Sequence, residues 1–164
     1  MSAPLNVLFL CTGNSARSVI AESLLNARGQ QRFHAFSAGS HPSGTLNALV
    51  LEYLASEGIA TAGLRSKSWD EFAAPGASIM DLVVTVCDQA AGESCPIWPG
   101  HPAKAHWGEP DPAAYMHDLD EARGVIRAVF NSMDRRIERL LRIPVHQLSP
   151  ATLREEARAI AALA

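Results

Sequence analysis

The sequence predicts an α/β fold with a parallel sheet and helices on both faces. Two short apolar runs, at residues 4–10 and 81–87, have the length and the branched side chains of strands buried on both faces. Segments with helical periodicity lie between the predicted strands, and this alternation is typical of parallel sheets. The chain has 164 residues, of which 48% are hydrophobic, so we expect one domain, residues 1–164, with its own core.

The first half of the chain contains two strand–helix pairs. They are expected at residues 4–10, 18–29, 33–38 and 45–57. Apolar residues three or four positions apart mark one face of each helix, as at Leu46, Leu49 and Val50. Gly29 and Gly58 follow the last periodic residue of each helix, where glycine often ends a helix.

The second half repeats the alternation of strand and helix. Strands are expected at residues 81–87 and 104–108, and helices at 119–143 and from Pro150 onward. Ser149 before Pro150 has the pattern of an N-cap followed by proline at the first helical position. We expect residues 144–164 to be a C-terminal extension of the domain, whose simplest role is packing.

Charge and cysteine content exclude several classes of protein. Fourteen Lys and Arg against 17 Asp and Glu give a net charge of −3, which argues against a nucleic-acid binder. No run approaches the ~18 apolar residues of a membrane span. A secretory signal would require basic residues near the start of the chain, and no Lys or Arg precedes Arg17. Three cysteines fit a disulfide framework poorly. We expect a cytoplasmic monomer without nucleic-acid or membrane partners.

A Cys-x5-Arg pattern joins the first strand to the first helix. Cys11 ends the apolar run and Ser18 opens the helix, so the backbone N–H groups between them are expected to converge on a bound oxyanion. The positive electrostatic field of these N–H groups should also lower the pKa of the Cys11 thiol. Arg17 supplies a planar guanidinium that can donate to two oxygens of the oxyanion. The predicted oxyanion-binding residues are Thr12, Gly13, Asn14, Ser15, Ala16, Arg17 and Ser18.

Three further residues are candidates for chemistry. Asp111, held before Pro112, suits a general acid, although Asp-Pro is also a common turn dipeptide. Cys87 and Cys95 have a spacing unlike that of a zinc pair, so we expect no metal site. Each thiol alone is explained equally well as a small buried residue. Together with Cys11, they suggest a relay of thiols.

Five segments carry a resemblance to a known family. CTGNSARS, SAGSHPSG, LRSKSW, DLVVTVCDQAAGESCP and HWGEPDP resemble the arsenate reductases built on the low-molecular-weight tyrosine phosphatase fold, over about residues 7–142. The resemblance implies a four-stranded parallel sheet in the order 2-1-3-4. That order places the first strand beside the third, and therefore Cys11 beside Cys87.

The resemblance also implies a reaction. Cys11 attacks arsenate held by the loop and Arg17, and Asp111 protonates the leaving hydroxide. Cys87 then attacks the Cys11 sulfur, arsenite leaves, and Cys95 attacks Cys87 in turn, as thiol–disulfide exchange allows. The last disulfide passes to thioredoxin, so no bound cofactor is expected. Phosphate and sulfate should bind as arsenate analogues.

Departures from the family pattern keep some alternatives open. Seven residues separate Cys87 from Cys95, where the best-known thioredoxin-linked members have six, so glutaredoxin with glutathione is the alternative reductant. Trp69 stands where some members have a carboxylate that helps to bind potassium. We therefore expect no potassium site, despite the residues that other members share with this chain, Asn14, Glu22 and Ser37.

Two other functions compete with arsenate reduction. A tyrosine phosphatase would need only Cys11, Arg17 and Asp111. Phosphatases of this fold usually carry aromatic residues after Asp-Pro, whereas Ala113 and Ala114 follow it here. A non-catalytic module that binds arsenite or another oxyanion would use the thiols but would need neither Arg17 nor Asp111.

The segment from Cys87 to Cys95 is expected to change conformation. If it is helical when reduced, a rise of ~1.5 Å per residue separates the two Cα atoms by roughly 12 Å. A disulfide needs Cα atoms within about 7 Å. Residues 88–95 must then unwind on oxidation, and Gly92 lowers the free energy that unwinding costs.

Overall fold

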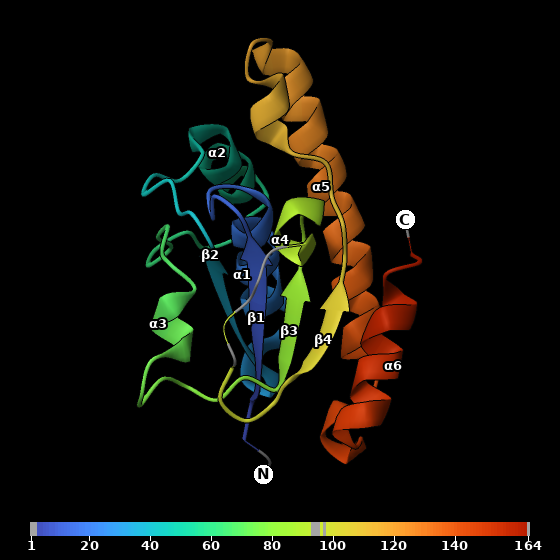
Figure 1. The fold of residues 1–164 in the computed structure, drawn as a ribbon. Helices are drawn as coiled ribbons and strands as arrows, with labels where there is room; N and C mark the ends of the chain where they lie inside the picture. The colour runs from blue at the N-terminus through green and yellow to red at the C-terminus, as the bar shows by residue number, and fades with distance from the viewer. Residues whose placement is uncertain (1–2, 93–95, 97, 164) are drawn as a thin grey trace.

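Four parallel strands form one sheet in the computed structural model, which describes residues 3–92, 96 and 98–163. The strands are β1 (Leu5–Cys11), β2 (Phe33–Gly39), β3 (Leu82–Thr85) and β4 (Ala103–His106), in the order β2-β1-β3-β4 (Figure 1). The predicted sheet and strand order are confirmed. Because all four strands run the same way, the loops that follow β1 and β3 meet at one edge of the sheet.

Six α-helices and three short 3-10 helices surround the sheet in the described part of the chain. The α-helices are α1 (Arg17–Gly29), α2 (Ala48–Ser56), α3 (Asp70–Ala73), α4 (Asp88–Gly92), α5 (Leu119–Leu141) and α6 (Pro150–Ile160). The 3-10 helices are η1 (Gln30–Arg32), η2 (Pro112–Tyr115) and η3 (Val145–Gln147). None of the helices in these ranges combines the length and apolar character needed to cross a membrane.

The two faces of the sheet are covered unequally. Val7 and Phe9 of β1 point into the larger core, which α1, α5 and α6 cover. Leu8 and Leu10 point the other way and pack in a smaller cluster with Phe72 of the short helix α3 and with residues of the neighbouring loops. Alternate β1 residues thus face opposite layers, which explains why this strand is apolar throughout.

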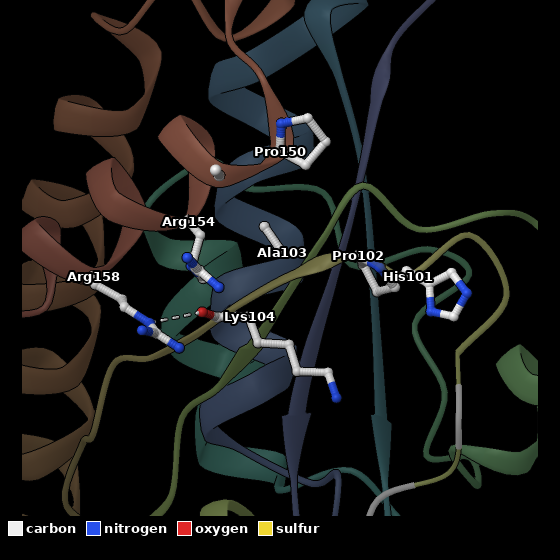
Figure 2. Close-up of a pocket in the computed structure, with 8 residues that line it drawn as sticks. His101, Pro102, Ala103, Lys104, Pro150, Arg154 and Arg158 are labelled. Atoms are coloured by element: carbon white, nitrogen blue, oxygen red, sulfur yellow. Dashed lines mark hydrogen bonds between the residues drawn. The ribbon is translucent and has the colours of Figure 1, made fainter.

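The C-terminal helix α6 packs beside β4, the strand at one edge of the sheet. Arg158 Nε donates a hydrogen bond of 3.3 Å to the Lys104 carbonyl oxygen, as Figure 2 shows. The two side chains and Arg154 line a pocket of about 280 Å³ between α6 and the strand. The Trp107 indole N–H donates to the Ala157 carbonyl at 2.9 Å and ties α6 to the chain after β4.

Some boundaries differ from the sequence prediction for local reasons. Helix α2 begins at Ala48, not at residue 45, because the Asn47 side chain accepts hydrogen bonds from the first free N–H groups of the helix. Strand β3 ends at Thr85, and α4 begins three residues later at Asp88. Helix α3 was not predicted, since four residues are too few to show a period.

Candidate active site

The loop between β1 and α1 encloses a pocket at the carboxyl edge of the sheet. Its volume is about 220 Å³. The lining residues are Cys11, Thr12, Gly13, Asn14, Ser15, Ala16, Arg17, Asp111 and Ala113. The structure thus brings Asp111 to the Cys-x5-Arg loop across some hundred residues of sequence.

Asn14 fixes the shape of this loop. Its backbone is left-handed, with a φ of 46°, a conformation that asparagine tolerates better than most residues. Its side chain is fully buried and donates to Ser18 Oγ (2.8 Å) and Ser37 Oγ (3.0 Å). Asn14 Oδ1 accepts from the backbone N–H of Lys67 at 2.8 Å. One side chain therefore joins the loop to α1, to β2 and to the segment before α3.

Gly39 lets the end of β2 approach the loop closely. A Cβ atom at this position would lie 2.4 Å from the Thr12 carbonyl oxygen and 3.0 Å from the Asn14 nitrogen. Both contacts are with backbone atoms, which cannot rotate away as a side chain can. Any other residue at this position would displace the loop.

The N-terminus of α1 faces the pocket without a side-chain cap. Ala16 occupies the N-cap position, its side chain accepts no hydrogen bond, and no acidic residue lies in the first turn. The N-cap side chain thus satisfies none of the first backbone N–H groups of this 13-residue helix, although the Ser18 N–H donates to the Cys11 sulfur. This arrangement favours an anion in the pocket.

The Cys11 thiol is buried beneath the loop. Its Sγ lies 2.9 Å from Ser18 Oγ, and the Asn14 N–H donates to it at 3.2 Å. Burial raises the pKa of the Cys11 thiol, and these hydrogen bonds only partly oppose the effect. The predicted lowering of this pKa is therefore wrong for the ligand-free protein. The prediction gave too much weight to the hydrogen-bond donors of the loop, because tertiary packing decides how deeply the Cys11 sulfur is buried.

Arg17 and Asp111 form an ion pair at the mouth of the pocket. Arg17 Nη2 lies 3.3 Å from Asp111 Oδ2, and Arg17 Nη1 donates to the Glu109 carbonyl oxygen at 3.2 Å. The side chain of Asp111 is 46% exposed, and its Oδ1 caps η2 by accepting from the Ala113 N–H. The guanidinium is thus held at the rim with its charge available to a bound anion.

Cys87 lies beside the loop, as the predicted strand order requires. Its Sγ is 3.6 Å from Thr12 Oγ1 and accepts from the Ala90 N–H at 3.3 Å. It is close enough to contribute to the raised pKa of Cys11. Both thiols are free and buried. Cys95 lies outside the described residues.

A buried polar network supports the loop from behind, and sequence analysis missed one of its members. Ser37 Oγ donates to Glu22 Oε1, and the Lys67 ammonium lies 3.9 Å from the same oxygen. Burial raises the pKa of Glu22 and lowers that of Lys67. An ammonium thus neighbours Glu22, one of the residues that family members with a potassium site share with this chain. Lys67 stands in the LRSKSW segment, but its position in sequence does not reveal that its side chain turns inward.

Metal ligands are not assembled in the described residues. Among residues 3–92, 96 and 98–163, no group of three or more His, Cys, Asp or Glu side chains is placed to hold a metal ion.

Comparison with known proteins agrees with this geometry. The sequence profile of the low molecular weight phosphotyrosine protein phosphatases matches residues 6–158. An arsenate reductase of Bacillus licheniformis is 33% identical over 133 residues, which cover 81% of this chain and 92% of the relative.

Solved structures give the same result. The crystal structure of an arsenate reductase from Archaeoglobus fulgidus is 30% identical, with a TM-score of 0.60 over 80% of this chain and 98% of that one. A thioredoxin-dependent arsenate reductase from Corynebacterium glutamicum is 28% identical, with a TM-score of 0.52 over 80% of this chain and 63% of that one. This chain therefore belongs to the low molecular weight phosphotyrosine protein phosphatase family, and within it to the arsenate reductases.

Proposed function

We propose that this chain reduces arsenate to arsenite by a relay of thiols that starts at Cys11. The observation that carries the proposal is the position of Cys87, whose thiol contacts Thr12 of the loop that encloses Cys11. A phosphatase has no use for a second thiol at this place. A reductase needs one, because two electrons must leave the protein for each arsenate.

Arsenate binds in the pocket of the loop. The backbone N–H groups of the loop that do not donate to Cys11, the N-terminus of α1 and the Arg17 guanidinium receive its oxygens. The dianion accepts the proton of the buried Cys11 thiol, whose pKa is raised in the ligand-free loop. The Ser18 hydroxyl and the Asn14 N–H hold the resulting thiolate.

The first step forms a bond between sulfur and arsenic. The Cys11 thiolate attacks the arsenic atom, and one arsenic–oxygen bond breaks. Asp111 gives its proton to the leaving hydroxide, which departs as water. The exposed position of the Asp111 carboxyl at the rim suits this role, because it can exchange protons with solvent.

The second step transfers the electrons. The Cys87 thiolate attacks Cys11 Sγ and forms a disulfide, while the electron pair of the sulfur–arsenic bond stays on arsenic and reduces it from As(V) to As(III). Cys95 then attacks Cys87 and releases Cys11 for the next cycle. The Corynebacterium relative that is named as thioredoxin-dependent supports thioredoxin as the final reductant. Glutaredoxin with glutathione is the alternative.

The test is arsenite formation with thioredoxin or glutaredoxin supplied separately. We expect Cys11→Ser and Cys87→Ser to reduce arsenite formation to the uncatalysed background, since each lacks a thiol of the first disulfide. Cys95→Ser should stop after one turnover with Cys11 joined to Cys87, which non-reducing peptide mapping detects. Sustained arsenite production by Cys87→Ser would contradict the relay.

Phosphate-ester hydrolysis is a second candidate, because Cys11, Arg17 and Asp111 meet in one pocket. The same variants separate the two activities. Cys87→Ser should retain any hydrolysis of p-nitrophenyl phosphate, whereas Cys11→Ser should lose it. A chain that hydrolyses this ester but forms no arsenite would be a phosphatase.

A further inference from the structure

Arg136 of α5 lies buried between two parts of the chain that are distant in sequence. Its side chain is 6% exposed. On one side, Nη1 contacts Glu109 Oε1 at 2.9 Å and the Gly108 carbonyl oxygen at 3.4 Å. On the other side, Nε donates to the Leu163 carbonyl (3.1 Å) and Nη2 to the Ala161 carbonyl (3.2 Å). One guanidinium thus links the segment after β4 to the C-terminal tail.

Glu109 extends this link to the active site. Its side chain is only 5% exposed, and burial raises the pKa of its carboxyl, while the Ser132 hydroxyl and the charge of Arg136 oppose the shift. Its backbone carbonyl accepts the hydrogen bond from Arg17 Nη1. Asp111 follows two residues later in the same segment. Any displacement of Glu109 therefore moves an acceptor of Arg17 and the position of Asp111 together.

Helix α6 holds in place the C-terminal tail, residues 161–163, which carries the carbonyl groups of Ala161 and Leu163. Leu153, Ala157 and Ile160 are buried against the larger core. Two hydrogen bonds anchor the helix, one from Trp107 in the chain after β4 to Ala157 and the other from Arg158 to the strand β4 (Figure 2). The carbonyl groups of Ala161 and Leu163 are therefore presented by a fixed element.

General stability alone does not require a guanidinium at this place. Burying a charged pair removes both groups from water, and a well-packed apolar replacement is often as stable or more so. What an apolar side chain cannot supply is a planar fork that contacts a carboxylate and two carbonyl groups at once. The geometry thus favours a role in positioning over a role in stability.

We propose that Arg136 is a positioning residue for the reaction: it uses the C-terminal tail as an anchor and holds Glu109, and through it Arg17 and Asp111, in place. The proposal rests on the proposed roles of Arg17 and Asp111. It gives residues 144–164, which otherwise only pack, a part in oxyanion binding.

The first experiment compares a substitution in α5 with one at the residue that directly follows this helix. Arg136→Met should lower the affinity for phosphate at least about tenfold and slow first-turnover arsenite formation about 100-fold, because misplacement of groups by about 1 Å can cost that much. The matched control is Arg142→Met, which removes an equal charge from an exposed pair with Glu138. It should change neither quantity.

Phosphate affinity is measured by the protection of Cys11 from alkylation, a readout that needs no turnover. If Arg136 only stabilised the fold, Arg136→Met would change the melting temperature. Phosphate would still protect Cys11 from alkylation at the concentrations that protect the wild type. Arg136→Met together with Glu109→Gln removes both buried charges and keeps the test valid if the single variant does not fold. A folded single or double variant with wild-type phosphate affinity would overturn the proposal.

A shortened chain tests the tail itself. A stop after Ile160 keeps α6 but removes the carbonyl groups of Ala161 and Leu163. It should weaken phosphate binding in the wild-type background and have no further effect in Arg136→Met, since both changes break one linkage. Equal losses in both backgrounds would show that the tail acts independently of Arg136. A wild-type chain that binds phosphate but forms no arsenite would refute the proposed function and leave this inference standing.

Discussion

Asn14 shows how much of the active site one residue can determine. Its left-handed backbone turns the loop, its N–H contacts the Cys11 sulfur, and its side chain holds Ser18 and the backbone of Lys67. Cys11 and Ser18 take part in the proposed chemistry, and Lys67 belongs to the segment that supports the loop. The loop therefore keeps its shape without bound oxyanion, which lowers the entropy lost on binding.

The reactivity of Cys11 should follow its raised pKa. We expect iodoacetamide to modify Cys11 more slowly than a free thiol at pH 7, and the rate to rise as the pH passes above 9.0, the ordinary value. Ser18→Ala should shift the profile further upward, because the Ser18 hydrogen bond lowers the pKa. Peptide mass analysis after timed alkylation measures the rate at each site. Rapid modification of Cys11 at pH 6 would contradict this prediction.

Glu22 should make stability depend on pH. Burial raises its folded-state pKa above the ordinary 4.5, so the folded protein binds this proton more tightly than the unfolded chain does. The contribution of Glu22 is thus fully present below pH 4.5 and is lost as the pH rises through the folded value. Glu22→Gln should lose less stability than the wild type as the pH rises.

Urea denaturation between pH 4.5 and 7 measures this difference. The matched control is Glu138→Gln, because Glu138 is more than half exposed on α5. Glu109 has a raised pKa as well, so the stability of Glu22→Gln and of Glu138→Gln still depends on pH. Only the difference in this dependence between Glu22→Gln and wild type reports on Glu22. Parallel curves for wild type and Glu22→Gln would show that the Glu22 carboxyl has no such linkage.

At the scale of elements, α4 is the part of the site that is least firmly held. It has five residues, and isolated helices of this length are unstable in water. Its first turn is held by the Ala90 N–H, which donates to Cys87 Sγ, and by the Asp88 carboxylate, which lies 2.8 Å from His106 Nε2. The His106 ring is in turn fixed by Thr85 at 2.8 Å. A disulfide at Cys87 alters the first of these contacts directly.

We therefore predict that oxidation of Cys87 opens α4. The Ala90 amide should be protected from hydrogen exchange in the reduced protein and lose that protection once Cys87 is oxidised. His106→Ala should lower protection in the reduced state while leaving the β1 amides unchanged. Mass-resolved exchange over residues 88–95 makes the comparison, although residues 93–95 lie outside the described structure. Equal protection in both redox states would refute the switch.

At the scale of the whole molecule, the sheet and α6 share Trp107 as a common contact. Its side chain is fully buried, packs against Phe9 of β1 at 6.0 Å between ring centroids, and donates to Ala157 of α6. It immediately follows β4 and precedes the segment that carries Asp111. Damage at this position should therefore reduce both stability and activity.

Trp107→Phe should reduce the free energy of unfolding by about 2 kcal/mol, because the smaller ring leaves a void and the Ala157 carbonyl loses its donor. Urea unfolding monitored by circular dichroism measures the loss. The exposed residue Leu119 offers a control, since Leu119→Ala removes apolar volume from the surface. A change below about 0.5 kcal/mol, the usual limit for surface substitutions, would contradict the central role of Trp107.

Local patterns in the sequence determined the sheet, the main helices and the loop. Apolar runs predicted β1 and β3, and Ser149 followed by Pro150 predicted the start of α6, where Ser149 Oγ accepts from the Thr152 N–H. The Cys-x5-Arg spacing predicted the pocket. These features depend on backbone geometry and side-chain period over a few neighbouring residues, which a sequence records directly.

Tertiary structure decided the features that depend on distant residues. Arg136 meets the C-terminal tail, Lys67 turns inward to Glu22, and Arg17 reaches the carbonyl of a residue 92 positions away. The raised pKa of Cys11 belongs to the same class, since it is the balance between burial in a core built from the whole chain and hydrogen bonds from one loop. A sequence lists the donors of that loop, but only packing decides how far the sulfur lies from water.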